Sequence, residues 1–315
     1  MSSVVCSRRS RVMRQLTILL FASLSIHSLW ADTYMKGQSV EPAFEGWLQN
    51  ADGSYSLLFG YLNENWDEEL DVPIGEDNFF TPYIGDRGQP THFLPRRNYF
   101  SFKVQVPADW GAQELSWTLT TNGVARTAYA SLSRNYALDN VVMASKTGAL
   151  RLGASNLEFR SNTPPLVTLQ GDAVRRVSVG QSLTLLAKVS DDGLPKAKPS
   201  ASSSSANSAA AERERLLRPP SRATSGKTNA LFLSWNLYRG KGGVTFDPPQ
   251  IKPWEDTRTS ANSPWGAFWT PPSVPADGMY SVDVNFAAPG TYILWARADD
   301  GGLYHDQYVT VHVTP

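Results

Sequence analysis

Leu183 to Pro195 reads LTLLAKVSDDGLP, and Pro289 to Val313 reads PGTYILWARADDGGLYHDQYVTVHV. The first stretch is an apolar run that ends at Asp191-Asp192-Gly193. The second contains a turn, an apolar run, another acidic turn with glycine and a final run in which valines alternate with polar residues. Short apolar runs bounded by Asp and Gly are typical of strands joined by turns. The two stretches therefore predict the frame of an antiparallel β-sandwich.

Three other runs in the C-terminal half support this prediction. Leu231, Leu233 and Trp235 alternate with polar or aromatic residues, which is the period of a half-buried strand. The strands that we expect here cover residues 174–179, 183–190, 231–238, 280–286, 292–298 and 308–313. A linker at Asn162–Pro165 precedes them, because proline fixes its own φ and disfavours a helix before it. We therefore expect a second domain over residues 163–315.

The N-terminal half shows the same patterns. Phe100, Phe102, Val104 and Val106 alternate with polar residues, and Asn122-Gly123 between two strand runs is the strongest short-range hairpin signal. Strands are also expected near Gly46–Leu48, at 54–63 and at 115–120. The stretch from Glu64 to Arg97 is expected to be a long irregular connection, and such connections inside a domain are usually functional. The fold class is thus all-β, with two tandem antiparallel β-sandwich domains over residues 34–160 and 163–315.

The order of motifs in the second half resembles a known family. The segments NTPPLVTL, GQSLTLLAKVSDDGLP, LFLSWNLYRGKGGVTF, VNFAAPGTYILWARADDG and DQYVTVHV are similar to the PKD-like, immunoglobulin-fold modules of secreted bacterial proteins. The resemblance implies that Tyr292 is the corner tyrosine of such a sandwich and that Trp235 is its core tryptophan. It also implies a spacer, an adhesion unit or a polysaccharide-binding unit. The first domain resembles no family in this way.

Two inserts depart from the resemblance. Residues 196–229 are rich in Ser, Ala, Lys and Pro, and such a composition predicts disorder. Residues 247–278 are rich in proline and carry Trp254, Trp265 and Trp269. These tryptophans are candidate ligand-binding residues if they form an exposed patch. The alternative is that they fold back and cover the sandwich, since tryptophan is usually mostly buried.

The N-terminus has the pattern of a processing segment. Four arginines precede the apolar run Leu16–Leu29, which is short for a membrane span and is followed by polar sequence. We expect residues 1–31 to be a signal peptide, with an uncleaved anchor as the alternative, and the mature chain to have no transmembrane helix. The protein would then be exported to the periplasm or beyond the cell. The only cysteine, Cys6, lies in this segment, so a mature chain would have no disulfide.

Charge and motifs limit the function classes. The formal net charge is zero, and removing residues 1–31 leaves an excess of four acidic residues, which argues against nucleic-acid binding. No Gly-x-Ser-x-Gly elbow or His-Glu-x-x-His motif is present. Within the 64–97 stretch, His92 and Arg87 are candidate ligand-binding residues, although a packing role is the simpler interpretation of His92.

Acidic side chains offer two further hypotheses. Asp191, Asp192, Asp299 and Asp300 could supply oxygens to Ca²⁺, the only cofactor that the sequence suggests, and ordinary turn chemistry is the alternative. If the protein acted on carbohydrate, its catalytic carboxylates would lie in the 64–97 stretch. Glu68 or Asp86, paired with an acid such as Asp77, are the residues concerned.

These observations lead to one functional expectation with one alternative. We expect an exported, non-enzymatic binding or structural module whose partner is a protein or polysaccharide of the cell envelope. The alternative is a carbohydrate-binding or carbohydrate-active protein that uses the 64–97 stretch and the tryptophan-rich insert. The oligomeric state cannot be read from these patterns.

Overall fold

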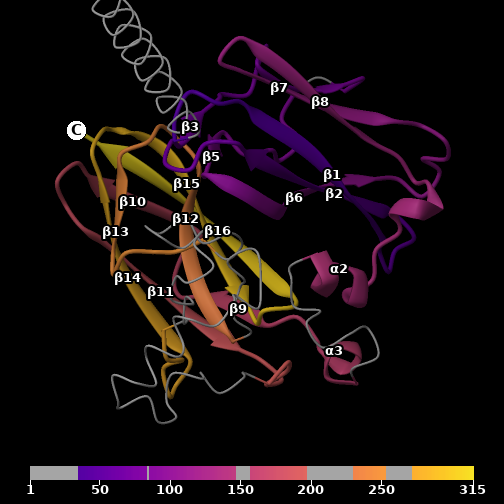
Figure 1. Cartoon of the computed structure of the whole chain (residues 1–315). Coiled ribbons are helices and arrows are strands. Elements are labelled where there is room, and N and C mark those ends of the chain that lie inside the picture. The colour runs from indigo at the N-terminus through magenta and orange to yellow at the C-terminus, as the bar shows by residue number, and fades with distance from the viewer. Residues whose placement is uncertain (1–34, 84, 147–156, 197–229, 253–271) are drawn as a thin grey trace, which may run out of the picture.

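The fold is all-β. The computed structural model describes residues 35–83, 85–146, 157–196, 230–252 and 272–315, and nearly all of its regular structure is β-strand (Figure 1). Helices in this part of the chain are limited to η2 (Arg134–Tyr136), α2 (Asn140–Lys146) and α3 (Leu157–Ser161). None of them is long and apolar enough to cross a membrane. The expected signal peptide and most of both inserts lie outside the described residues.

The first domain packs two three-stranded sheets around an aromatic core. One sheet has the order β1 (Val40–Gln49), β2 (Tyr55–Asn63), β6 (Arg96–Val106), and the other has the order β4 (Asn78–Thr81), β7 (Leu115–Thr121), β8 (Val124–Ala130). Trp117 is fully buried between them, stacked on Phe80 and edge-on to Phe102. The β7–β8 hairpin turns at Asn122-Gly123, where both residues have positive φ, as that dipeptide predicts.

Residues 64–97 are more regular than we expected. They contain β4 and the short pair β3 (Leu70–Asp71) and β5 (His92–Phe93). The prediction of one long irregular connection was therefore wrong in part. These strands are two to four residues long, which is too short for a period-2 pattern to be visible in the sequence.

The second domain is a sandwich of two four-stranded sheets. One has the order β13 (Val244–Asp247), β14 (Met279–Phe286), β11 (Leu183–Ser190), β9 (Leu166–Leu169), and the other has the order β10 (Val174–Ser178), β16 (Tyr304–Thr314), β15 (Gly290–Asp299), β12 (Phe232–Arg239). In chain order these are the ABED and CFG sheets of an immunoglobulin sandwich. β10 joins the second sheet by pairing in parallel with β16.

Two side chains expected from the resemblance take the expected places. The Tyr292 hydroxyl donates to the main-chain carbonyl of Ala288 at 2.9 Å, four residues upstream, as in a tyrosine corner. Trp235 is 2% exposed and lies in the core of the sandwich. Gly240 has a positive φ, and a Cβ there would collide with the Tyr292 ring. The second domain is therefore an immunoglobulin-like sandwich by strand order and by corner geometry.

Candidate functional site at the domain interface

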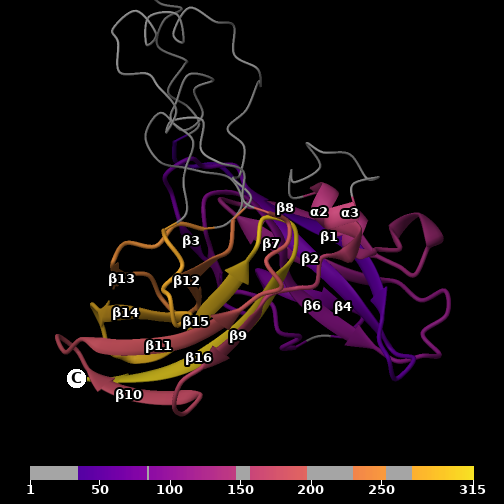
Figure 2. The same ribbon diagram turned by 90° about the horizontal axis from the view of Figure 1, so that it is seen from below.

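The outer face of β15 and β16 is covered by the first domain. Alternate residues of β15, such as Leu294 and Ala296, point into the sandwich core, so that Trp295 and Arg297 point outward. Trp295 and Tyr238 of β12 are nevertheless buried, within the hydrophobic cluster of the first domain. β15 and β16 lie beside β2 and β6 in both views (Figure 1, Figure 2). The two domains thus share a packed interface.

A buried ion pair lies at the centre of this interface. Arg297, which is 0% exposed, donates through Nε and Nη2 to the two carboxylate oxygens of Asp306, both at 2.7 Å. It also donates to the main-chain carbonyls of Tyr99 at 3.2 Å and Phe100 at 2.6 Å. Burial opposes the charge, but the attraction of Asp306 outweighs it and raises the pKa of Arg297. Two of these four hydrogen bonds pair the cation with Asp306 within the second domain, and the other two hold the first domain.

The backbone of β6 is bent to meet Arg297. The register between β2 and β6 shifts between Phe59 and Tyr61, and Phe100 within the shift has a φ of 48°. A positive φ is uncommon for a large side chain and persists only where the surroundings fix it. Gly60 lies opposite, and a Cβ there would collide with the carbonyl of Asn98. This bulge places the Phe100 carbonyl against the guanidinium.

The 64–97 stretch forms a second contact, with the end of β12. The main-chain N–H of Thr91 donates to the carbonyl of Tyr238 at 3.1 Å, and the Tyr238 hydroxyl donates to the carbonyl of Gly88. Arg239 donates to both carboxylate oxygens of Asp86 at 2.7 Å. The stretch that the sequence marks as functional is therefore one of the parts of the first domain that hold the second domain.

His92 holds Asp71, an acidic side chain that takes part in this contact. It is 4% exposed, and its Nδ1 lies 2.7 Å from Asp71 Oδ1 while its Nε2 lies 3.1 Å from Glu69 Oε2. Only the protonated ring can donate to two carboxylates at once. Burial lowers its pKa, but the hydrogen bonds that the ring donates to both acids outweigh burial and raise it to about 9. Asp71 also accepts from the N–H of Gly242 in the second domain at 2.8 Å.

Between these contacts the domains leave a cavity of about 700 Å³, called the interdomain cavity below. Leu58, Phe100 and Lys103 line it from the first domain. Tyr304, Tyr308, Thr310 and Ile293 line it from the second, and Asp86, Arg239, Asn140, Met143 and Asp306 complete much of its wall. The volume and the mixture of aromatic and polar groups are typical of small-molecule sites, which often form at domain interfaces.

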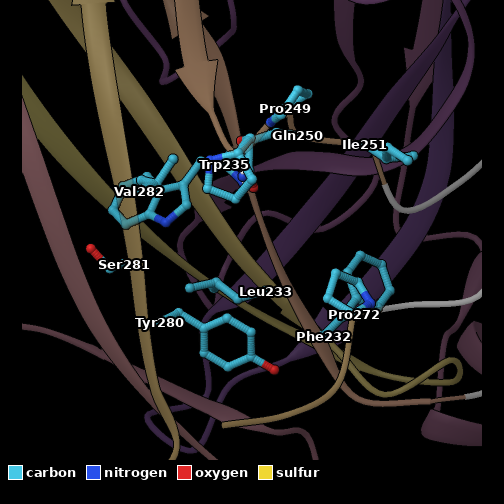
Figure 3. Close-up of a pocket in the computed structure, with 11 residues that line it drawn as sticks. Phe232, Leu233, Trp235, Pro249, Gln250, Ile251, Pro272, Tyr280, Ser281 and Val282 are labelled. Carbon is cyan, nitrogen blue, oxygen red and sulfur yellow. Dashed lines mark hydrogen bonds between the residues drawn. The ribbon is translucent and has the colours of Figure 1, made fainter.

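A smaller cavity of about 130 Å³ opens beside β12 and β14 (Figure 3). Trp235, Phe232, Tyr280 and Pro272 are among its lining residues. The Nε1 of Trp235 and the hydroxyl of Tyr280 are buried there without a hydrogen-bond partner among the described residues, and burial raises the pKa of Tyr280 to about 12. Ile251 and Pro272, which also line the cavity, lie close in sequence to residues outside the described part of the chain, and we assign no ligand to it.

The predicted site residues fall into different places. His92 is buried, and Arg87 lies over the Tyr83 ring with its guanidinium carbon 4.6 Å from the ring centroid. Neither of them lines the interdomain cavity. Trp254, Trp265 and Trp269 lie outside the described residues, so their binding role stays a prediction.

The three acids proposed for carbohydrate chemistry are not brought together in one cavity. Glu68 accepts from the N–H of Gly37 at 2.6 Å, and Asp86 is held by Arg239. Of Glu68, Asp77 and Asp86, Asp86 alone lines the interdomain cavity. The Arg239 hydrogen bonds outweigh partial burial and hold the pKa of Asp86 below its ordinary value, so this carboxylate has no proton to give near neutrality.

The four candidate calcium ligands lie in two turns. Asp191 and Asp192 accept from the N–H groups of Gly193 and Leu194 at 2.8 Å. Asp299 accepts from Gly301 at 2.8 Å, and Asp300 accepts from Gly302 at 2.6 Å. Within the described residues, no group of three or more His, Cys, Asp or Glu side chains could hold a metal ion. Calcium binding stays a prediction, and this geometry is that of ordinary Asp turns.

Comparison with known proteins adds little to this description. No family model matches the sequence, and no curated protein is similar enough to count as a match. The N-terminal eight Ig domains of Down Syndrome Cell Adhesion Molecule isoform 1.30.30 are 9% identical, with a TM-score of 0.22 over 88% of this chain and 27% of that chain. Titin domains z1z2, in complex with telethonin, are 10% identical, with a TM-score of 0.22 over 88% and 98%. Surface layer protein SbsC domains 4–9 are 10% identical, with a TM-score of 0.24 over 88% and 30%.

This chain spans about a quarter of the length of the first of these structures. Similarities of this size carry no argument about function. The immunoglobulin-like assignment of the second domain rests on its strand order and on Tyr292.

Proposed function

We propose that this chain is an exported, non-enzymatic binding module whose ligand occupies the interdomain cavity. The observation that carries the proposal is the cavity of about 700 Å³ between two domains held together by the buried Arg297. A site walled by a fixed interface is pre-formed, so that little ordering entropy is lost on binding.

The carboxylates of the cavity support a binding role rather than catalysis. Asp86 is held by Arg239, and Asp306 is held by Arg297, each through both of its oxygens. A general acid needs a proton near neutral pH, and a general base needs free lone pairs facing the substrate. Two bidentate ion pairs offer neither. The same pairs suit a wall that orients a ligand without reacting with it.

Export and the PKD-like relationship belong to the same proposal. The arginine-rich, apolar segment of residues 1–31 supports export to the periplasm or the extracellular space. There the partner would be a polysaccharide or a protein of the cell envelope. A cavity of this size would accept a short stretch of glycan or a small soluble ligand, not a folded protein domain.

The test is to fill the cavity. Thr310 lines it from β16, so Thr310→Trp places a large ring inside. Thr245→Trp is the matched control, because Thr245 is exposed on β13 in the other sheet and does not line the cavity. The wild type and both variants are assayed on immobilised glycans and on a cell-envelope fraction.

We expect Thr310→Trp to lose at least about tenfold in affinity, or about 1.4 kcal/mol. Thr245→Trp should bind as the wild type does. Equal binding by all three proteins would refute the cavity as the site. If the wild type is not retained on any surface, the binding proposal fails and a purely structural spacer becomes the better account, which the tight domain interface favours.

The tryptophan-rich insert remains the alternative binding surface. Replacing Trp254, Trp265 and Trp269 by alanine one at a time would locate the binding there if one variant loses retention while its melting temperature stays near that of the wild type. That outcome, with Thr310→Trp unaffected, would move the site from the cavity to the insert.

A further inference from the structure

The charges on the cavity wall do not cancel. Of the Asp, Glu, Lys and Arg side chains that line it, Asp86 is paired with Arg239, and Asp306 is paired with Arg297. Lys103 of β6 is exposed and has no ion-pair partner among the described residues. Its neighbour across the strand pair is Leu58, which cannot neutralise it. The cavity therefore has one uncompensated positive charge.

The wall also has unused hydrogen-bonding groups. No side-chain hydrogen bond within the described residues involves Tyr308, Thr310 or Asn140, and all three line the cavity. Together with the ammonium of Lys103, they offer two hydroxyls, an amide and a cation with three donors. A ligand with many hydroxyl groups could satisfy them at the same time, whereas a hydrocarbon ligand would leave them unpaired.

One aromatic ring is free to contact such a ligand. Phe100, Phe102 and Tyr238 are buried, and the Tyr304 ring is stacked with Phe100 and contacts the Arg297 guanidinium. Tyr308 is 37% exposed and contacts Tyr238 edge to face. The face of the Tyr308 ring gives the cavity an apolar surface, and its hydroxyl adds a polar group at the end of the side chain. A ligand ring that is apolar on its face and polar at its edge can contact both.

From these three features, and resting on the binding role proposed above, we propose that the ligand is an acidic saccharide. Its anionic group lies against Lys103, and a sugar ring packs against Tyr308. The anionic group of the ligand forms an ion pair with Lys103, which has no such partner among the described residues. Thr310 and Asn140 hydrogen-bond to sugar hydroxyls. The charge requirement distinguishes this ligand from the neutral glycans that the cavity size alone would allow.

Matched saccharides test the proposal. Short oligouronates and sulfated oligosaccharides are titrated into the protein by calorimetry, each beside a neutral counterpart prepared by carboxyl reduction or desulfation. A short acidic peptide serves as the non-saccharide probe. Lys103→Gln removes the charge, Lys103→Arg keeps it, and Lys188→Gln is the control, since Lys188 is exposed on β11 in the sheet away from the cavity.

We expect at least one acidic saccharide to bind about tenfold or more tightly than its neutral counterpart, with an affinity that falls as salt is added. Lys103→Gln should abolish the difference, while Lys103→Arg and Lys188→Gln should keep it. Uronate and sulfate arms show which anion is preferred.

Three results would overturn the inference. Equal binding of acidic and neutral saccharides would remove the charge requirement but leave the cavity as a binding site. Binding of the acidic peptide alone would replace the ligand class. If no saccharide or peptide binds, and Thr310→Trp behaves as the wild type does on every surface, the proposed function fails as well.

Discussion

Nη2 of Arg297 donates a hydrogen bond of 2.6 Å to the main-chain carbonyl of Phe100, a residue 197 positions earlier in the chain. The arginine belongs to the immunoglobulin-like sandwich, and the carbonyl belongs to a bulged strand of the first domain. Because the guanidinium is fully buried and also paired with Asp306, neither partner can be lost without leaving a charge in the interface. This contact joins the two folds and fixes one end of the interdomain cavity.

Replacing Arg297 should therefore destabilise both domains together. Removing one partner of a buried ion pair typically costs about 3–5 kcal/mol, and Arg297→Met leaves Asp306 without its cation. Chemical denaturation should show a lower midpoint for the whole protein. Arg126→Met is the control, because the Arg126–Glu41 pair is partly exposed and should cost about 0–1 kcal/mol. Equal losses in the two variants would contradict the central role of Arg297.

His92 should make stability depend on pH above neutrality. Its pKa is raised from 6.5 to about 9 in the folded protein, so protonation favours the folded state. The contribution is fully present below about pH 6.5 and is lost as pH rises through 9, with a size on the order of 3 kcal/mol. We expect the difference in unfolding free energy between the wild type and His92→Gln to shrink over this range. A difference that stays constant from pH 6 to about pH 9 would show that His92 is not held protonated.

Much of the fold follows from sequence patterns. The long strands β2, β6, β11 and β15 have clear apolar runs, and Asn122-Gly123 marks its hairpin. The short strands β3, β4 and β5 do not, because two to four residues cannot display a period. Tyr292 was predictable because its corner is a local feature, closed by a residue only four positions away.

The site was much harder to predict. Lys103 and Tyr308 come together only because two domains dock, and nothing local in the sequence specifies that docking. One signal was available. The run YILWARA at Tyr292–Ala298 has no polar alternation, and a strand that is apolar on both sides is usually buried on both faces. That run indicated that a second layer covers this sheet, although not which one.

Asp300 should oppose folding once it is ionised. Burial and the neighbouring Asp299 raise its pKa from 3.8 to about 7, so the folded protein holds the proton more tightly than the unfolded chain does. The free energy of unfolding should fall as pH rises from about 4 to 7, and Asp300→Asn should remove that fall and be more stable at pH 8 by at least about 1 kcal/mol.

Addition of calcium tests the alternative that this acidic turn binds a metal ion. If millimolar Ca²⁺ raises the melting temperature of the wild type but not of Asp300→Asn, the acidic turn is a metal site.

The two core tryptophans should respond differently to a small change. Trp117→Ala and Trp235→Ala are each expected to cost about 3–5 kcal/mol, since both side chains are buried. Trp117→Phe also breaks the 3.0 Å hydrogen bond to Asn78, whereas the Nε1 of Trp235 has no hydrogen-bond partner in the part of the chain that the structure describes. Trp235→Phe should therefore cost less than Trp117→Phe by about 1 kcal/mol or more. If urea denaturation shows a larger loss of stability for Trp235→Phe than for Trp117→Phe, the Nε1 of Trp235 has a hydrogen-bond partner.

The interdomain cavity as the binding site is the central claim, and a crystal structure of the protein with a bound ligand tests it most directly. The ligand is the saccharide with the highest affinity in the calorimetric titrations. The account predicts ligand density between Lys103 and Tyr308, with an anionic group within hydrogen-bond distance of the lysine ammonium and the domain interface unchanged. Density on residues 247–278 or at the Asp191 and Asp299 turns, with the cavity filled by solvent alone, would contradict it.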